Sequence, residues 1–200
     1  TTFALNAADG SMLWKYPASV QNGRFFFAPP LALPEGGVIV GDYSNGVYSL
    51  DPKTGAQQWA FNEAGGRFIA GPTTLNGTIF APNADHVLYA LNAGGHLVWK
   101  FTAKQPLWAP VAIDGQYLYL ASLDHNLYKI QSSDGKMVWS ADVGGAAVSA
   151  PYVATDGTLY QATLAGEVVA VSADTGSVLW RQSLGAPAWS TPLTGTGVLY

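Results

Sequence analysis

A tryptophan recurs along this chain at nearly constant spacing, with successive steps of 45, 40, 40 and 41 residues. A glycine precedes each of these tryptophans by four positions. A repeat of about 40 residues that contains several strand-like segments is typical of a β-propeller, in which each repeat forms one blade. The five tryptophans are Trp14, Trp59, Trp99, Trp139 and Trp180, and the five glycines are Gly10, Gly55, Gly95, Gly135 and Gly176.

The interval from Pro151 to Trp180 shows what one repeat contains. Short runs of alternating apolar residues are interrupted by Asp156-Gly157 and Thr175-Gly176, and these interruptions predict tight turns between antiparallel strands. We therefore expect an all-β protein with four antiparallel strands per repeat, which is the composition of a propeller blade. The third strands of the blades are predicted at 47–50, 88–91, 127–130 and 168–171.

Each end of the chain supplies half a repeat. Residues 3–16 match the last two strands of a blade, and residues 192–200 match the first two. We expect residues 1–200 to form a single domain of five blades, with one blade shared between the termini so that the ring closes and hides its edges. The alternative is a segment of a ring with seven or eight blades, which would expose two apolar blade faces. Because the chain begins at Thr1 without a signal-peptide pattern, we interpret it as a mature region or one excised from a longer chain.

Composition narrows the possible function classes. The net charge is −4 and no cluster of Lys and Arg occurs, so we expect no nucleic-acid partner. No apolar run approaches the length of about 18 residues that a membrane-spanning helix requires. The absence of cysteine excludes disulfides, thiolate metal sites and cysteine catalysis.

The periodic tryptophans are interpreted as structural. A buried indole removes about 150–250 Å² from water, so a ring at the same place in every blade would hold adjacent sheets together. His86 and His125 each follow an aspartate at the turn between the second and third strands. We interpret both as turn residues, because histidine tolerates positive φ better than most residues. The weaker alternative is a surface metal site made by the two Asp-His pairs on neighbouring blades.

The segments that lead into the first strand of each blade carry residues that do not repeat. Trp108 and Trp189 lie there outside the periodic set, and Arg24 and Arg67 each precede a proline by five positions. Aromatic and arginine side chains are enriched among the residues that contribute most of the binding energy at protein–protein interfaces. In a propeller these segments line the funnel on one face of the ring, which we call the funnel face. We predict a ligand-binding surface there, with the tryptophans as stacking walls, the arginines as charge anchors and Phe68 beside them. The alternative is that the indoles plug the channel and the arginines are solvated.

The stretch Val47-Tyr48-Ser49-Leu50-Asp51-Pro52-Lys53-Thr54-Gly55, followed by Trp59, resembles the blade signature of the pyrroloquinoline quinone (PQQ)-like repeat family. Leu88-Tyr89-Ala90-Leu91-Asn92, followed by Trp99, repeats it. That family contains eight-bladed dehydrogenases that bind PQQ and Ca²⁺, an outer-membrane assembly lipoprotein without a cofactor, and secreted or surface propellers, some of them attached to kinases. The resemblance implies a periplasmic or extracellular location.

The sequence therefore favours a non-enzymatic binding or scaffold propeller, monomeric and without a cofactor, that engages a protein, peptide or glycan through one face. The first alternative is a PQQ- and Ca²⁺-dependent quinoprotein dehydrogenase, or a fragment of one. Many such enzymes carry a vicinal disulfide against the quinone, which this chain cannot form. Its acidic residues stand mostly at turn positions rather than in a cluster suited to Ca²⁺. The second alternative is the sensor ectodomain of a larger signalling protein.

Overall fold

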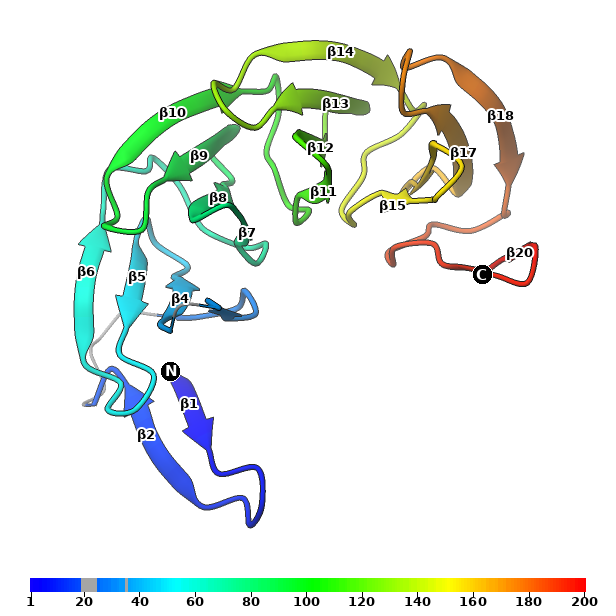
Figure 1. Cartoon of the computed structure of the whole chain (residues 1–200). Coiled ribbons are helices and arrows are strands. Elements are labelled where there is room, and N and C mark those ends of the chain that lie inside the picture. Colours follow the sequence, from blue (N-terminus) through cyan, green and yellow to red (C-terminus); the bar gives the residue numbers. More distant parts are fainter. Residues whose placement is uncertain (19–24, 35) are drawn as a thin grey trace.

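The computed structural model describes residues 1–18, 25–34 and 36–200. These residues form strands and turns arranged as consecutive antiparallel sheets along an open arc (Figure 1). Four sheets have four strands each and form complete blades. Their strands are β3 Leu31–Ala32, β4 Val38–Gly41, β5 Val47–Leu50 and β6 Gln57–Phe61; β7 Thr73–Leu75, β8 Thr78–Pro82, β9 Val87–Leu91 and β10 Leu97–Thr102; β11 Ala112–Asp114, β12 Tyr117–Ala121, β13 Asn126–Gln131 and β14 Met137–Asp142; β15 Tyr152–Val153, β16 Thr158–Ala162, β17 Glu167–Ser172 and β18 Val178–Ser183.

Two half-blades flank the four complete blades. The N-terminal half-blade pairs β1 (Thr2–Leu5) with β2 (Met12–Tyr16), and the C-terminal half-blade pairs β19 (Thr194–Gly195) with β20 (Val198–Leu199). The predicted all-β propeller architecture is confirmed, as is the count of five blade equivalents. The predicted third strands agree with β5, β9, β13 and β17 to within one residue at either end.

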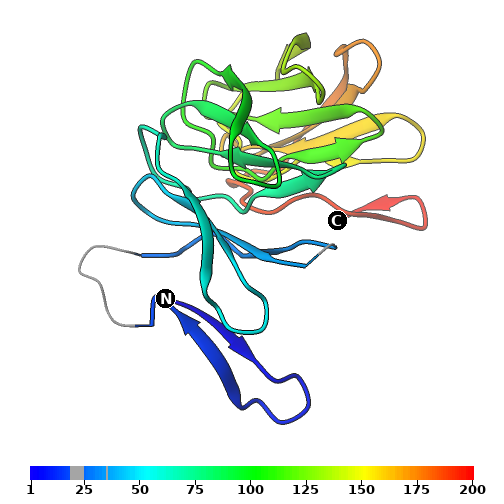
Figure 2. The ribbon, with the colours of Figure 1, turned by 60° about the vertical axis from the view of Figure 1, so that its left-hand side comes forward.

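The predicted closure of the ring is not what the structure shows. The two half-blades belong to separate sheets instead of pairing into one blade. Figures 1 and 2 show the blue N-terminal hairpin and the red C-terminal hairpin as separate ribbons at the two ends of the arc. The reason is geometric, because the rotation between successive blades is set by how their faces pack, and five blade equivalents packed in this way do not complete a circle.

A β-bulge in the outermost strand aims each periodic tryptophan at the next blade. In all five repeats the pairing register between the third and fourth strands shifts at the residue before the tryptophan. Such a bulge adds one unpaired residue and bends the strand, so the side chains that follow are re-aimed. The inserted residues are Leu13, Gln58, Val98, Val138 and Leu179.

Four of the five indoles dock on the glycine turn of the following blade. The Nε1–H of Trp99 donates to the carbonyl of Ser132 at 3.0 Å, and the ring lies against Gly135. Trp14, Trp59 and Trp139 make the same contacts with the next blade's turn. Trp180 is 42% exposed, and among the described residues no following turn covers it. At the other end of the arc the turn at Gly10 has open space around it, with no indole against it.

The hydrophobic core is divided among the junctions between blades. One buried cluster joins the N-terminal half-blade to the first complete blade, and three more join successive complete blades. Aromatic pairs recur at these junctions, such as Phe61 with Tyr89 at 5.3 Å and Phe101 with Tyr128 at 5.2 Å between ring centroids. Each blade is thus stabilised by its two neighbours, as in other repeat architectures.

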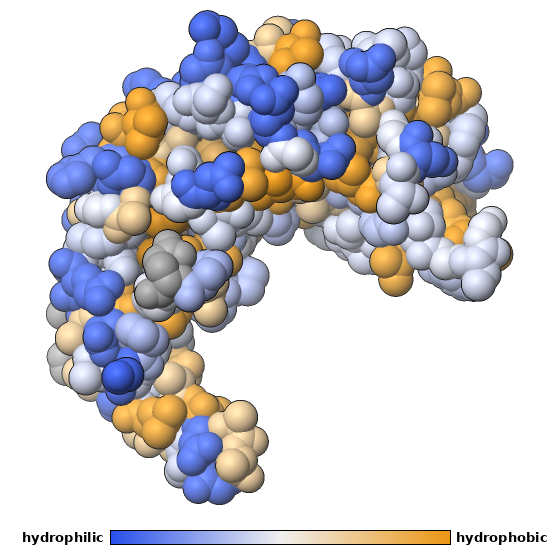
Figure 3. Space-filling model, viewed as in Figure 1, coloured by the Kyte–Doolittle hydropathy of each residue, from blue (hydrophilic) through white to orange (hydrophobic). Residues whose placement is uncertain are grey.

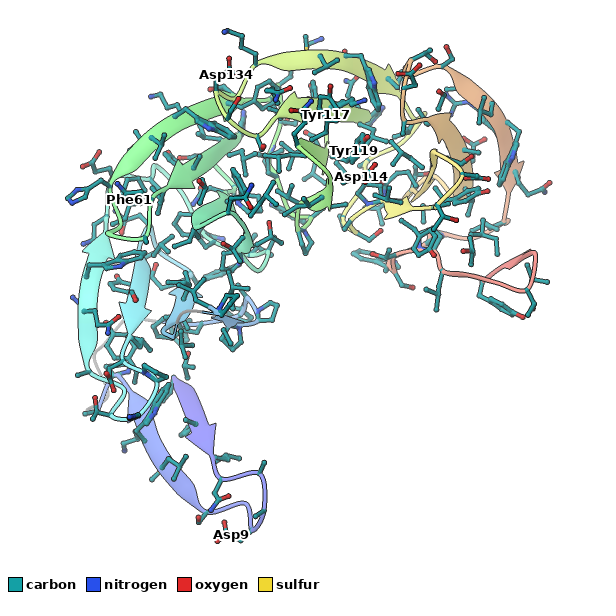
Figure 4. All side chains as sticks on the ribbon, in the orientation of Figure 1. Asp9, Phe61, Asp114, Tyr117, Tyr119 and Asp134 are labelled. Atoms are coloured by element: carbon teal, nitrogen blue, oxygen red, sulfur yellow. The ribbon has the colours of Figure 1, made fainter. Side chains whose placement is uncertain are left out.

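A buried lysine ties the third and fourth blades together. Lys129 on β13 donates from Nζ to the carbonyl of Ala173 at 2.7 Å, and its ammonium lies 4.0 Å from the ring centroid of Tyr117. Tyr119 lies on the same strand as Tyr117, near Asp114 (Figure 4). Burial, with Asp114 as a further cause, raises the pKa of Tyr119 to about 12. The Lys129 ammonium thus lies near the rings of Tyr117 and Tyr119 and donates to one carbonyl, an arrangement that offsets its desolvation.

The described residues contain no helix that is long and apolar enough to cross a membrane. Apolar side chains do reach the surface along the outer strands. Figure 3 shows them as separate orange patches along the outer margin of the arc, with hydrophilic residues between them. They include Met12, Leu13, Leu97, Val98, Met137, Val138, Val178 and Leu179.

Candidate binding surface on the funnel face

The segments that connect one blade to the next run across one face of the arc, and backbone hydrogen bonds fix their position. The amides of Phe68, Leu107 and Ala147 donate to carbonyls in the turn between the second and third strands of the blade that each segment leaves. A second set of amides, in the corresponding turn of the next blade, donates back to the segment, as Ala84 does to Arg67. The three connections between complete blades are therefore hydrogen-bonded to the blades on both sides.

These hydrogen bonds define equivalent positions in the connections. The residue that follows Phe68, Leu107, Ala147 or Ala188 is apolar in every case, and Phe27 occupies the same position before the first complete blade. Trp108 is 39% exposed and Trp189 is 67% exposed, so these side chains face solvent. We call this series the apolar rim, which consists of Phe27, Ile69, Trp108, Val148 and Trp189.

A pocket of about 550 Å³ opens on this face between the connections that lead into the first three complete blades. Two of the predicted residues, Arg67 and Trp108, line it together. They are contributed by successive connections, and the fold brings them to one cavity. The remaining lining residues are Phe27, Tyr43, Gly66, Ile69, Ala84 and Pro106.

Arg67 is held on an aromatic support. Its Cζ lies 4.7 Å from the ring centroid of Tyr43, and its Nη1 donates to the Tyr43 hydroxyl at 3.2 Å. The Tyr43 ring in turn packs against Phe27, with 4.6 Å between centroids. Sequence reasoning missed Tyr43, because it stands alone in a turn and repeats in no other blade. Phe27 carried a signal, since it belongs to the same kind of segment as Trp108.

The other predicted site residues lie elsewhere. Phe68 is only 1% exposed and belongs to the core between the first two complete blades, so it cannot contact a ligand as predicted. Side chains alternate along the extended connection, and this places Phe68 inward while Arg67 and Ile69 face the pocket. Trp189 stands on the apolar rim but does not line this pocket. Arg24 lies outside the described residues, and the register places Phe25 at the position equivalent to Arg67.

In two blades, an Asp-Tyr pair holds the preceding connection through a hydrogen bond to its backbone. Asp85 accepts from the Tyr89 hydroxyl at 2.6 Å and from the amide of Gly65 at 2.7 Å. Asp124 accepts in the same way from Tyr128 and from the amide of Lys104. Burial and the neighbouring carboxylate raise the pKa of Tyr89 and of Tyr128. Burial acts to raise the pKa of Asp124, but the hydrogen bonds from Tyr128 and nearby amides outweigh it and hold that pKa below its ordinary value.

The two histidines have the backbone geometry of turn residues. His86 and His125 have φ values of 75° and 71°, in the left-handed region that the turn interpretation requires. Among the residues that the structure describes, no group of three or more His, Asp or Glu side chains is arranged to hold a metal ion.

Comparisons with known proteins identify relatives of this chain. The family profile described as outer membrane protein assembly factor BamB matches residues 2–94, 84–156 and 153–200. The outer membrane protein assembly factor BamB of Moranella endobia is 27% identical over 160 residues, covering 71% of this chain and 39% of that protein. The tetrathionate hydrolase of Acidithiobacillus ferrooxidans is 27% identical over 126 residues, covering 50% of this chain and 25% of that protein.

Solved structures show the same fold. BamB from Moraxella catarrhalis superposes with a TM-score of 0.75 at 20% identity, covering 95% of this chain and 58% of that one. A chain of the mitotic checkpoint complex superposes with a TM-score of 0.78 at 12% identity, covering 94% of this chain and 59% of that one. The chain thus spans well under two thirds of the proteins that it matches.

Proposed function

Because the chain belongs to the family described as outer membrane protein assembly factor BamB, whose propellers are built from PQQ-like repeats, we propose that it is a non-enzymatic scaffold that engages a protein partner through its funnel face. A propeller fold by itself hosts many functions, so the proposal rests on the site and not on the fold alone. The relatives named for outer-membrane assembly support a location outside the cytoplasm, in the periplasm or beyond.

The apolar rim is the observation that carries this proposal. Packing between blades does not account for the tryptophans at this position, since Trp108 is 39% exposed and Trp189 is 67% exposed. Exposed aromatic and aliphatic side chains grouped on one face, beside an arginine, have the composition of a protein interaction surface. Because two blades hold the connections of Ile69, Trp108 and Val148 by backbone hydrogen bonds, this part of the rim is presented with little conformational freedom, which lowers the entropic cost of binding.

The test replaces the rim without touching the core. A triple variant, Ile69→Ser with Trp108→Ser and Val148→Ser, is compared with wild type for recovery of partners from extracts of the source organism, with the bound proteins identified by mass spectrometry. The matched control carries Leu97→Ser and Val98→Ser on the outer edge, where exposed apolar residues lie far from the funnel. We expect the rim variant to lose a specific partner that the control retains. Equal recovery by both variants would contradict a role for the funnel face.

A further inference from the structure

We infer that the pocket beside Arg67 binds a peptide carboxylate that adjoins an aromatic or aliphatic side chain. This inference rests on the proposed function, because it names the chemistry of the partner segment that the funnel face accepts. It combines two properties of the pocket, namely a guanidinium held in place by stacking and apolar walls around it.

The stacked arginine keeps most of its hydrogen-bonding capacity free. A guanidinium has five N–H donors in its plane, and Arg67 uses one of them on the Tyr43 hydroxyl. Stacking on Tyr43 occupies a face of the guanidinium and leaves its edge for a ligand. Among the described residues the ion pairs are Lys136–Asp134 and Arg181–Glu167, so Arg67 has no carboxylate partner there. A carboxylate matches the free edge of the guanidinium, because its two oxygens accept two parallel N–H···O hydrogen bonds.

The walls of the pocket select what accompanies the carboxylate. Among the described residues that line the pocket, Arg67 is the one that carries a charge, and Phe27, Ile69, Pro106 and Trp108 supply apolar surface around it. The volume of about 550 Å³ is within the range of small-molecule sites and accommodates one large side chain with its neighbour. A peptide with phenylalanine beside aspartate, or a chain that ends in phenylalanine, presents a carboxylate next to a large apolar side chain.

The probes are three short peptides, of which the first two differ at a single residue. The first is acetyl-Gly-Phe-Asp-Gly-amide, the second replaces its aspartate with asparagine, and the third is acetyl-Gly-Gly-Phe with a free terminal carboxylate. Each is titrated into the full chain, and binding is followed by NMR chemical shifts of the Trp108 indole and neighbouring amides. We expect the aspartate peptide to bind at least about tenfold more tightly than the asparagine peptide, because a charged hydrogen bond is lost on substitution. The third peptide shows whether a terminal carboxylate substitutes for a side-chain one.

Substitutions separate the charge from the apolar walls. Arg67→Met should remove the preference for the aspartate peptide over the asparagine peptide. Trp108→Ala should weaken the binding of both peptides by a similar factor. The control is Lys104→Met, which removes a cation from the next connection without altering the pocket lining, and it should keep the preference. Equal binding of both peptides to wild type, a preference that survives in Arg67→Met, or no binding of any peptide at millimolar concentration would overturn the inference.

The outcome is distinguishable from failure of the scaffold proposal. If the rim variant keeps its partner while Arg67→Met abolishes the preference for aspartate, the pocket recognises carboxylates but the partner docks elsewhere. If the rim variant loses its partner while the peptides show no preference, the funnel face is the docking surface but Arg67 does not read a carboxylate.

Discussion

The indole of Trp99 lies so close to Gly135 that a Cβ atom built on this glycine would stand 2.5 Å from the ring carbon Cε3. The two residues belong to successive blades, and the backbone at Gly135 has a φ of +71°. Glycine therefore meets two requirements here: it has no Cβ that would clash with the indole, and it adopts a positive φ without steric cost. The same relationship joins Trp14 to Gly55, Trp59 to Gly95 and Trp139 to Gly176.

Substitution of Gly135 by alanine should therefore be severely destabilising. The left-handed conformation costs an L-residue about 1–2 kcal/mol, and displacement of the indole adds about 1–3 kcal/mol. We expect the midpoint of urea unfolding to fall accordingly. The matched control is Gly157→Ala, since Gly157 has a φ of +80° but a Cβ built on it meets nothing within 4 Å. It should show the conformational cost alone, and equal losses in the two variants would show that the indole moves aside freely.

Trp99 and Trp180 occupy the same place in their repeats but should differ in their contribution to stability. Truncation of a buried tryptophan to alanine costs about 3–5 kcal/mol. Trp99→Ala should approach this range, because its ring docks on the next blade. Trp180→Ala should cost markedly less, because its ring is 42% exposed. Chemical denaturation of both variants measures the difference, and a large loss in Trp180→Ala would mean that the indole is covered in solution.

The carboxylate of Asp124 should make stability depend on pH in the acid range. Its pKa is lowered in the folded chain, so its contribution is fully present above the unfolded pKa of about 3.9 and is lost as the pH falls through the folded pKa. Asp124→Asn should lose about 1 kcal/mol at neutral pH, where the charged hydrogen bonds matter. It should converge with wild type toward pH 2. Asp156→Asn is the control, because its carboxylate caps only its own turn.

Lys129 should tolerate loss of its charge better than loss of its length. Its aliphatic stem fills space between the third and fourth blades, and its ammonium replaces lost hydration with the Ala173 carbonyl and the Tyr117 face. Lys129→Met keeps the volume and removes a buried charge, so we expect a change of less than about 1.5 kcal/mol. Lys129→Ala should cost about 2–5 kcal/mol by analogy with other large-to-small changes at buried sites. Comparison of thermal midpoints tests the order of the two variants.

Addition of PQQ and Ca²⁺ should leave the thermal midpoint unchanged if the chain is a scaffold. A ligand present at about 100 times its dissociation constant would stabilise the fold by about 2.7 kcal/mol. For about 200 residues this corresponds to a rise of roughly 5–11 °C. Such a rise would favour the quinoprotein alternative. Tetrathionate in the same assay examines the relationship to the hydrolase, of which this chain matches a quarter.

Much of the blade could be predicted because its signals are local. Turn glycines mark where strands end, and alternating apolar residues identify the buried face of each strand. Because a shift of one residue in register would move every side chain to the other face, this alternation also specifies the register. The connections were harder, because exposure there depends on which way an extended segment turns. The sequence pattern predicts Phe68 at the surface, whereas it lies in the core, and the pattern gives no signal for Tyr43. The contact between Tyr43 and Arg67 joins a turn of the first complete blade to the connection that follows this blade, and no spacing in the sequence encodes it.

The sequence by itself determined the repeat unit, since the recurring tryptophan and glycine are the two halves of one contact and their period specifies where each blade begins and ends. The tertiary structure decided the curvature of the array. The angle between blades arises from the fit of whole faces, summed over many side chains, and five blade equivalents at that angle form an open arc (Figure 1). It also decided the pocket on the funnel face, because Arg67 and Trp108 meet there only after successive blades have docked.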